Sequence, residues 1–179
     1  LKTEIIFVDD ESGDNSYNLI NKFIKNYKSK NIIKLKVIRS RKNLGKGGAL
    51  KLGVKLARHQ WILTSDIDMS VSLFQFSKWL KRKFIKNKYS VYFGSRSHKK
   101  SNVQRDFLRK TLGDIGSLLI AIILGIKIKD TQCGYKLYKK SIIKPIFFKI
   151  KDYGFNHDLE IILLLKKKNI EIEKLPVKW

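Results

Sequence analysis

The stretch IIFVDDESGD, residues 5–14, decides the fold, because four apolar residues run directly into a group of acids. A short, continuous apolar run of this kind predicts a buried strand of a parallel sheet. The stretch WILTSDID, residues 61–68, repeats the arrangement, with Asp66 and Asp68 following the apolar residues. Ligands of open α/β sheets bind beyond the carboxyl ends of the strands, so we expect a site at both acidic groups.

Strands and helices alternate through the first half of the chain. We expect strands at 5–8, 35–39, 61–64 and 89–95. Helices with one apolar face are expected between them, at 14–29, 45–59 and about 72–87. This order predicts an α/β fold with a mostly parallel sheet, right-handed crossovers and helices on both faces.

The second half opens with 105–126, which is expected to be one long helix, basic at its start and apolar at its end. The remaining expected elements are a strand at 135–138, helices around 141–148 and 157–168, and a strand at 170–177. The sequence has no internal repeat, no low-complexity linker and only two prolines. We therefore expect residues 1–179 to form a single domain.

Charge is the unusual property of the composition. The 39 Lys and Arg against 15 Asp and Glu leave a formal charge of +24, which favours polyanionic partners such as nucleic acid, anionic membranes or phosphates. A general preference for lysine explains the charge equally well. Acids at the ends of two strands would repel a nucleic-acid backbone, so we expect no nucleic-acid partner. The single cysteine excludes an internal disulfide and a cysteine-rich metal site.

Two segments early in the chain are candidate nucleotide contacts. The carboxylates of VDDESGD, among them Asp9 and Asp10, can accept hydrogen bonds from a base or a ribose. Asp10 to Asp14 can equally well form only a turn and cap the next helix. In NLGKGGA, residues 43–49, glycines allow close approach of a ligand and Lys46 can neutralise a phosphate. A simple turn into a helix explains this segment as well as a site does.

Asp66 and Asp68 are candidate metal ligands. In an extended segment residues i and i+2 point the same way, so both carboxylates can face one cation. Such oxygen ligands suit Mg²⁺ or Mn²⁺ bridging a diphosphate. Near the chain's other end, Asp158 and Glu160 are candidates for a base or an orienting group, or are acids favoured by a helix start.

Basic side chains follow the strand at 89–95. Arg96 suits bidentate recognition of phosphate, and Arg105 and Arg109 share a face of the expected helix, where both can meet one anion. A solvated, basic helix start is the alternative. The apolar run behind it, residues 118–126, is too short to span a bilayer and is either core or an interfacial helix at a membrane surface.

Six motifs in a fixed order resemble family-2 glycosyltransferases, and more narrowly the dolichyl-phosphate glucosyltransferase and polyprenyl-phosphate mannosyltransferase group. They are VDDESGD (8–14), NLGKGGA (43–49), SDID (65–68), GSR (94–96), DTQCGYKL (130–137) and HDLE with LPVKW (157–160, 175–179). The resemblance implies the GT-A fold of nucleotide-sugar transferases. DTQCG is similar to the glucosyltransferase side, which implies UDP-glucose as donor and a dolichyl-type polyprenyl phosphate as acceptor; GDP-mannose is the alternative donor.

The resemblance also implies roles for single residues. Asp9, Asp10, Lys46 and Asp66 would bind the nucleotide sugar, with Asp66 and Asp68 holding Mg²⁺ or Mn²⁺. Arg96, Arg105, Arg109 and Gln132 would bind the acceptor phosphate, and Asp68, Asp158 and Arg96 would be the catalytic residues. The implied reaction is a direct, inverting displacement in which positioning and charge neutralisation outweigh base catalysis.

The family's opening strand and loop have no counterpart before Leu1. The resemblance therefore implies a truncated chain that lacks a central strand, and we expect it to be poorly stable or inactive by itself. The resemblance also implies a place at the cytoplasmic face of a membrane, with the membrane surface as a partner.

Overall fold

The computed structural model describes residues 2–28, 32–103, 125, 130–154 and 156–179. These residues divide into two compact units, one made of 1–62 with 140–161 and the other of 63–139 with 162–179. Each unit is described by itself, and the expectation of a single domain over 1–179 stays a prediction.

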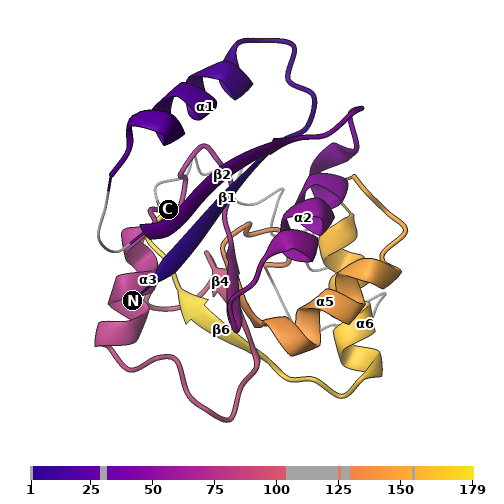
Figure 1. The fold of residues 1–179 in the computed structure, drawn as a ribbon. Helices are drawn as coiled ribbons and strands as arrows, with labels where there is room; N and C mark the ends of the chain where they lie inside the picture. The colour runs from indigo at the N-terminus through magenta and orange to yellow at the C-terminus, as the bar shows by residue number, and fades with distance from the viewer. Residues whose placement is uncertain (1, 29–31, 104–124, 126–129, 155) are drawn as a thin grey trace. The chain divides into compact units, whose positions relative to one another are not determined.

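The first unit is built around a pair of parallel strands (Figure 1). The elements before residue 62 are β1 (Thr3–Asp9), α1 (Ser16–Asn26), β2 (Ile32–Arg39) and α2 (Gly45–Leu56). β1 pairs with β2 in parallel, and Asp9 and Arg39 are opposite each other at the carboxyl ends. Helix α5 (Lys140–Lys149) packs against α2, and α6 begins at His157 and continues to Lys167 in the other unit.

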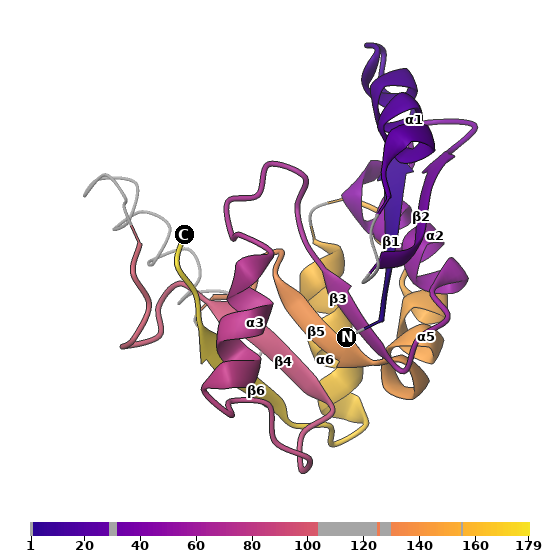
Figure 2. The ribbon, with the colours of Figure 1, turned by 60° about the vertical axis from the view of Figure 1, so that its left-hand side comes forward.

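The second unit is built around a four-stranded sheet with the order β3-β5-β4-β6 (Figure 2). Its strands are β3 (Trp61–Thr64), which crosses from the first unit, β4 (Val91–Ser95), β5 (Lys136–Lys139) and β6 (Ile172–Pro176). β4 is parallel to β6 and antiparallel to β5. The sheet is thus mixed, and the expected parallel pairing holds for β1–β2 and β4–β6.

Helix α3 (Phe74–Lys81) closes one side of this sheet through Trp79. The Trp79 ring is fully buried, donates its Nε1–H to Pro176 O at 2.8 Å and meets the Tyr135 ring edge-on. β4 is buried along its whole length, with Val91, Tyr92 and Phe93 at 0% exposure. A central strand covered on both faces favours this continuous apolar and aromatic sequence.

Two helices are shorter than the sequence predicts. The helix expected at 14–29 begins at Ser16, because the Asp14 carboxylate accepts the Ser16 N–H at 2.9 Å and turns the chain before the helix. The helix expected over 72–87 ends at Lys81. Lys83 has φ +52° and Phe84 N–H bonds to Trp79 O, a Schellman-type end that apolar periodicity does not reveal.

The prediction of a buried first strand is wrong in degree. Residues 4–8 of β1 are half-buried, and only Asp9 is buried. Within the described residues β1 pairs with β2 alone, so one strand edge covers less of it than a central position would. The long helix expected over 105–126 lies outside the described residues apart from Gly125. No described helix is long and apolar enough to cross a bilayer.

Candidate functional site

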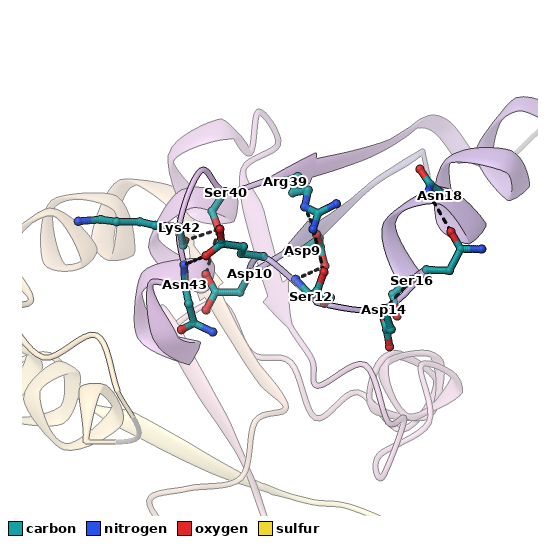
Figure 3. Close-up of polar contacts among 12 residues, drawn as sticks. Asp9, Asp10, Ser12, Asp14, Ser16, Asn18, Arg39, Ser40, Lys42 and Asn43 are labelled. Carbon is teal, nitrogen blue, oxygen red and sulfur yellow. Dashed lines mark hydrogen bonds and ion pairs between the residues drawn. The ribbon is translucent and has the colours of Figure 1, made fainter.

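In the first unit, the acidic loop after β1 is tied to the loop after β2 (Figure 3). Arg39 Nε lies 3.2 Å from Asp9 Oδ2, and Arg39 also donates to Ser12 O at 2.8 Å. The Asp9 side chain is 2% exposed and that of Arg39 is 41% exposed. The contact at 3.2 Å is an ion pair without hydrogen-bond alignment, since Oδ2 accepts no hydrogen bond within the described part of the chain. Arg39 therefore neutralises a buried carboxylate.

The next two acids hold the loop that follows β2. Asp10 Oδ1 accepts the Leu44 N–H at 2.8 Å and the Ser40 hydroxyl at 3.1 Å. Glu11, whose φ is +62°, accepts the Asn43 N–H at 2.6 Å. The carboxyl ends of the two parallel strands are thus joined by hydrogen bonds that backbone N–H groups of the loop after β2 donate to acids of the loop after β1.

These contacts bear on both interpretations of the VDDESGD segment. The turn is confirmed at Asp14, whose pKa is lowered by hydrogen bonds from the Ser16 hydroxyl and N–H. The cap is not: the N-cap residue of α1 is Asn15, whose side chain makes no capping hydrogen bond. Asp9 and Asp10 lie together at the strand end, as predicted, with one oxygen of each engaged by the neighbouring loop. Their contact with a nucleotide stays a prediction.

The glycines of the segment 43–49 serve close packing. Gly45 has φ +75°, and a Cβ there would lie 2.6 Å from Tyr153 O. A Cβ on Gly47 would lie 2.7 Å from the His157 Cβ, and the N–H groups of Gly47 and Gly48 both donate to Tyr153 O. These two N–H groups are therefore committed to the chain before α6, which favours the packing interpretation for the glycines. Lys46 lies in the first turn of α2.

The two acids at the start of α6 have different surroundings. Glu160 accepts the N–H groups of Lys151 and Asp152 at 2.8 and 3.0 Å, so it holds the preceding loop. Asp158 is buried, with Oδ1 3.2 Å from His157 Nε2. His157 Nδ1 lies 2.6 Å from Gly154 O, and because a carbonyl only accepts, Nδ1 carries the proton. Sequence reasoning gave Asp158 and Glu160 equal weight, and this geometry assigns Glu160 to the loop.

The second unit contains an open cleft beyond the carboxyl ends of β3 and β4. Its walls come from four segments and are mainly polar. The lining residues are Ser65, Asp66, Ser70, Val71, Arg96, Gln132, Cys133, Gly134, Tyr135 and Trp179. Three predicted site residues, Asp66, Arg96 and Gln132, therefore line one cavity.

The SDID segment forms a turn, which contradicts the extended geometry assumed for it. Met69 has φ +53° and its N–H bonds to Asp66 O at 3.3 Å. Asp66 lines the cleft, whereas exposed Asp68 accepts the N–H and hydroxyl of Ser70 at 3.0 and 2.7 Å and is not among the lining residues. The alternation of an extended strand therefore does not place both carboxylates on one side here.

Gly134 makes room for the Asp66 carboxylate. A Cβ on Gly134 would lie 2.2 Å from Asp66 Oδ2 and 2.6 Å from Oδ1. The Gly134 carbonyl in turn accepts the Thr64 hydroxyl at 3.1 Å, which ties the 130–135 segment to β3. The position of Asp66 thus depends on a residue 68 places away that has no side chain.

Arg96 is held by Asp130, a partner that sequence reasoning missed. Asp130 accepts from Nε and Nη2 of the guanidinium at 2.9 and 2.7 Å and from the Arg96 N–H at 2.7 Å. Burial lowers the pKa of Arg96, but the hydrogen bonds and charge of Asp130 raise it overall. Arg96 also lies over the Trp179 ring, 5.6 Å from its centroid. It is therefore a fixed and charge-paired part of the cleft wall.

Two ionisable groups of the cleft stay protonated. Burial raises the pKa of the Cys133 thiol, and the negative charge of Asp130 raises it further, so the thiol is a poor nucleophile. Burial also raises the pKa of Tyr135 to about 12, and its hydroxyl accepts the Phe76 N–H and donates to Leu73 O. Both residues therefore serve packing, as expected for the cysteine.

Gln132 is exposed at the cleft, whereas Arg105 and Arg109 lie outside the described residues. Sequence reasoning missed Arg39 and Trp179 as well as Asp130. Asp130 opens a motif that the sequence made visible, and Arg39 ends a strand as Asp9 does, but neither pairing could be read without the fold.

The donor set allows a hydrated divalent ion. The described residues hold no cluster of three or more His, Cys, Asp or Glu side chains that could enclose a metal. Mg²⁺ keeps several waters and is commonly bound by one or two carboxylates together with substrate phosphates. Asp66 in the cleft wall, with Asp68 beyond it, fits that kind of site and not an all-protein cage.

Sequence comparison points to one family. A model of the family described as "Glycosyl transferase family 2" matches residues 1–147. The chain is 34% identical to a dolichyl-phosphate beta-glucosyltransferase of Dictyostelium discoideum and covers 54% of it, with 98% of this chain aligned. It is 32% identical to the Saccharomyces cerevisiae protein of the same name, of which it covers 56%, again over 98% of this chain. The chain thus spans about half the length of the curated relatives it matches.

Solved structures share the fold. Mannosyl-3-phosphoglycerate synthase of Rubrobacter xylanophilus aligns with a TM-score of 0.66 at 14% identity, over 98% of this chain and 55% of that one. Glucosyl-3-phosphoglycerate synthase of Mycobacterium tuberculosis, in complex with Mn²⁺, UDP-glucose and glycerol 3-phosphate, aligns at 0.58 and 11% identity, over 99% and 70%. The α/β fold of nucleotide-sugar transferases expected from the sequence is confirmed.

Proposed function

We propose that this chain, which belongs to glycosyl transferase family 2, is the catalytic part of an enzyme that transfers glucose from UDP-glucose to a dolichyl-type polyprenyl phosphate. One observation carries the proposal: relatives named dolichyl-phosphate beta-glucosyltransferase align with 98% of the chain at up to 34% identity. The cleft of the second unit supplies the chemistry that such a transfer needs.

The donor's diphosphate is assigned to a divalent ion held by Asp66. Asp68, which lies outside the cleft, is kept as a second ligand on the strength of the sequence motif. A bound Mg²⁺ or Mn²⁺ would neutralise the charge that develops on the leaving nucleotide. A neighbour in fold was crystallised with Mn²⁺ and UDP-glucose, which supports this assignment in general terms. Asp9 and Asp10, at the carboxyl end of β1, are proposed to accept hydrogen bonds from the uracil or ribose, and Lys46 to face phosphate.

The acceptor phosphate is assigned to the cleft wall formed by Arg96 and Gln132. Asp130 already neutralises much of the Arg96 charge, so Arg96 attracts a distant phosphate only weakly. Its main proposed role is to orient the bound phosphate through hydrogen bonds. Arg105 and Arg109 are kept as further acceptor contacts on the strength of the sequence alone.

A strong base is not needed for this reaction. The acceptor phosphate is ionised at neutral pH, so its oxygen attacks the anomeric carbon directly. The bond from that carbon to the diphosphate oxygen breaks, UDP leaves, and the configuration at the carbon is inverted. The residues then contribute by positioning the two substrates and by balancing charge. Asp158, buried beside His157, is proposed to orient a substrate near the reacting centre. We place the enzyme at the cytoplasmic face of a membrane, where a polyprenyl phosphate is reached.

Sugar transfer by membranes from cells that express this protein tests the proposal. Radiolabelled UDP-glucose or GDP-mannose is offered with polyprenyl phosphate and Mg²⁺, and label extracted into organic solvent is counted. Label from UDP-glucose alone supports the proposal, and label from GDP-mannose alone replaces the donor. The Asp66→Asn variant should give no label, whereas Asp14→Asn, which changes only an exposed turn before α1, should keep it. No extractable label from either donor overturns the acceptor class.

A further inference from the structure

Four large apolar side chains are exposed in the segment 67–74, which follows β3. Ile67 and Phe74 are 71% and 77% exposed, and Met69 and Leu73 are each 43% exposed. We call these four residues the apolar rim. Single exposed apolar residues are ordinary, but four within so short a segment favour a surface that contacts another apolar phase.

The apolar rim borders the cleft that holds the candidate site. Ser70 and Val71, which lie between its two halves, are lining residues of the cleft. Leu73 O accepts a hydrogen bond from the hydroxyl of Tyr135, another lining residue. Trp179, 38% exposed, lines the same cleft and lies against Arg96. A ligand in this cleft would therefore have apolar side chains at its mouth.

The surrounding sequence is uniformly basic. Residues 69–103 contain nine Lys and Arg and no Asp or Glu. Lys78 and Lys81 lie on α3, which begins at Phe74, and Lys99 and Lys100 follow shortly after Arg96; all four are exposed. Exposed lysines around an apolar patch are the combination that binds anionic lipid surfaces, since the apolar groups enter the interface and the cations meet headgroups.

We propose that the apolar rim docks on an anionic bilayer surface and holds the mouth of the cleft at the depth of the lipid headgroups. The use of this docking rests on the proposed function. A lipid acceptor whose phosphate lies at the headgroup level would reach Arg96 without leaving the bilayer. The sequence had suggested membrane contact only for the segment 118–126, so this surface is a second and independent one.

An environment-sensitive label tests the docking without any transfer reaction. The Phe74→Cys protein is labelled with NBD and mixed with vesicles of phosphatidylcholine and phosphatidylserine. Wild-type protein checks that buried Cys133 takes no label. The matched control is Asn87→Cys, which is exposed between Lys86 and Lys88 just before β4, at the end of that strand away from Arg96.

With these vesicles, we expect the emission of NBD at position 74, and not at position 87, to shift to shorter wavelength and to be quenched by brominated lipids. The response to vesicles of phosphatidylcholine alone should be weaker. Equal responses at both positions would mean a general attraction of basic protein to lipid and would overturn the proposal. NBD emission at position 74 that is already blue-shifted without vesicles would show that protein covers the rim. Emission that vesicles leave unchanged would show that the rim does not insert. Either result would overturn the proposal.

Kinetics separate this inference from the proposed function. The double variant Leu73→Asn, Phe74→Asn should raise the KM for long-chain polyprenyl phosphate in vesicles about tenfold, because its apolar anchor is lost. The KM for UDP-glucose and turnover of a short, water-soluble prenyl phosphate should stay within about twofold. If the double variant has an unchanged KM for polyprenyl phosphate in vesicles, the proposal that the rim docks on the bilayer is contradicted. If wild-type protein transfers no sugar at all, the proposed function fails and the NBD result still decides the docking.

Discussion

Arg96 and Asp130 lie 34 residues apart in the chain, yet the Asp130 carboxylate accepts three hydrogen bonds from Arg96 at 2.7 to 2.9 Å. Two come from the guanidinium and one from the backbone N–H, so both the side chain and the chain direction after β4 are set. The pair joins the GSR and DTQCG motifs, which are separate segments of the sequence, into one wall of the cleft.

Asp130→Asn tests this pair. The substitution keeps the shape of the side chain but leaves the Arg96 charge without its counter-ion, and we expect the free energy of unfolding to fall by about 2 kcal/mol. The estimate is below the range for fully buried pairs because the Arg96 side chain is 21% exposed. Urea unfolding followed by circular dichroism measures the change. Asp14→Asn, which removes only the charge of an exposed turn residue, is the control, and an equal loss there would contradict the role of the pair.

Gly134→Ala should displace the Asp66 carboxylate, because the new Cβ would meet Oδ2 at 2.2 Å. We expect transfer to fall by about a hundredfold or more, since misplacing a group at a reacting centre by about 1 Å has this effect. The Mg²⁺ concentration for half-maximal rate should rise. Gly13→Ala is the matched control, since its Cβ would meet nothing within 4 Å. Normal metal dependence in folded Gly134→Ala would refute the assignment of Asp66.

Asp68→Asn should reduce turnover more than Asp158→Asn. The first change removes charge proposed to act on the diphosphate, whereas an ionised acceptor needs little help from a base at Asp158. Turnover with saturating UDP-glucose and polyprenyl phosphate, at matched circular dichroism spectra, compares the two. The same loss in both folded variants would mean that proton transfer matters as much as charge balance.

Cys133 gives a pH dependence whose sign follows from burial. Its pKa is raised above the ordinary value of 9.0, so between that value and the native pKa the unfolded chain loses a proton that the native protein keeps. Stability supplied by the protonated thiol is therefore complete below pH 9.0 and is lost as the pH rises. The native thiol should also react with a disulfide reagent far more slowly than the urea-unfolded one at pH 8. Equal rates would show an accessible thiolate, and Cys133→Ser should remove the pH dependence.

The sequence by itself determined the family, the order of the elements and the regions of the site. Apolar runs that end in acids identified β1 and β3, and β3 was bounded correctly at both ends. The prediction succeeded there because local periodicity and local acidity lie on the same few residues. It was less accurate where a helix ends in a Schellman-type turn or begins after the turn at Asp14, since those ends depend on backbone geometry.

Only the tertiary structure decided which of the predicted polar residues work together. The turn at Met69 leaves Asp68 outside the cleft that Asp66 lines. The space that Asp66 occupies depends on Gly134. Asp130 pairs with Arg96 because folding brings their two segments together. Glu160 likewise accepts hydrogen bonds from the loop before α6. Residue type and spacing report what a side chain can do, but partners distant in sequence settle its charge, its direction and its exposure. These contacts are set by packing, which no local pattern of residues records.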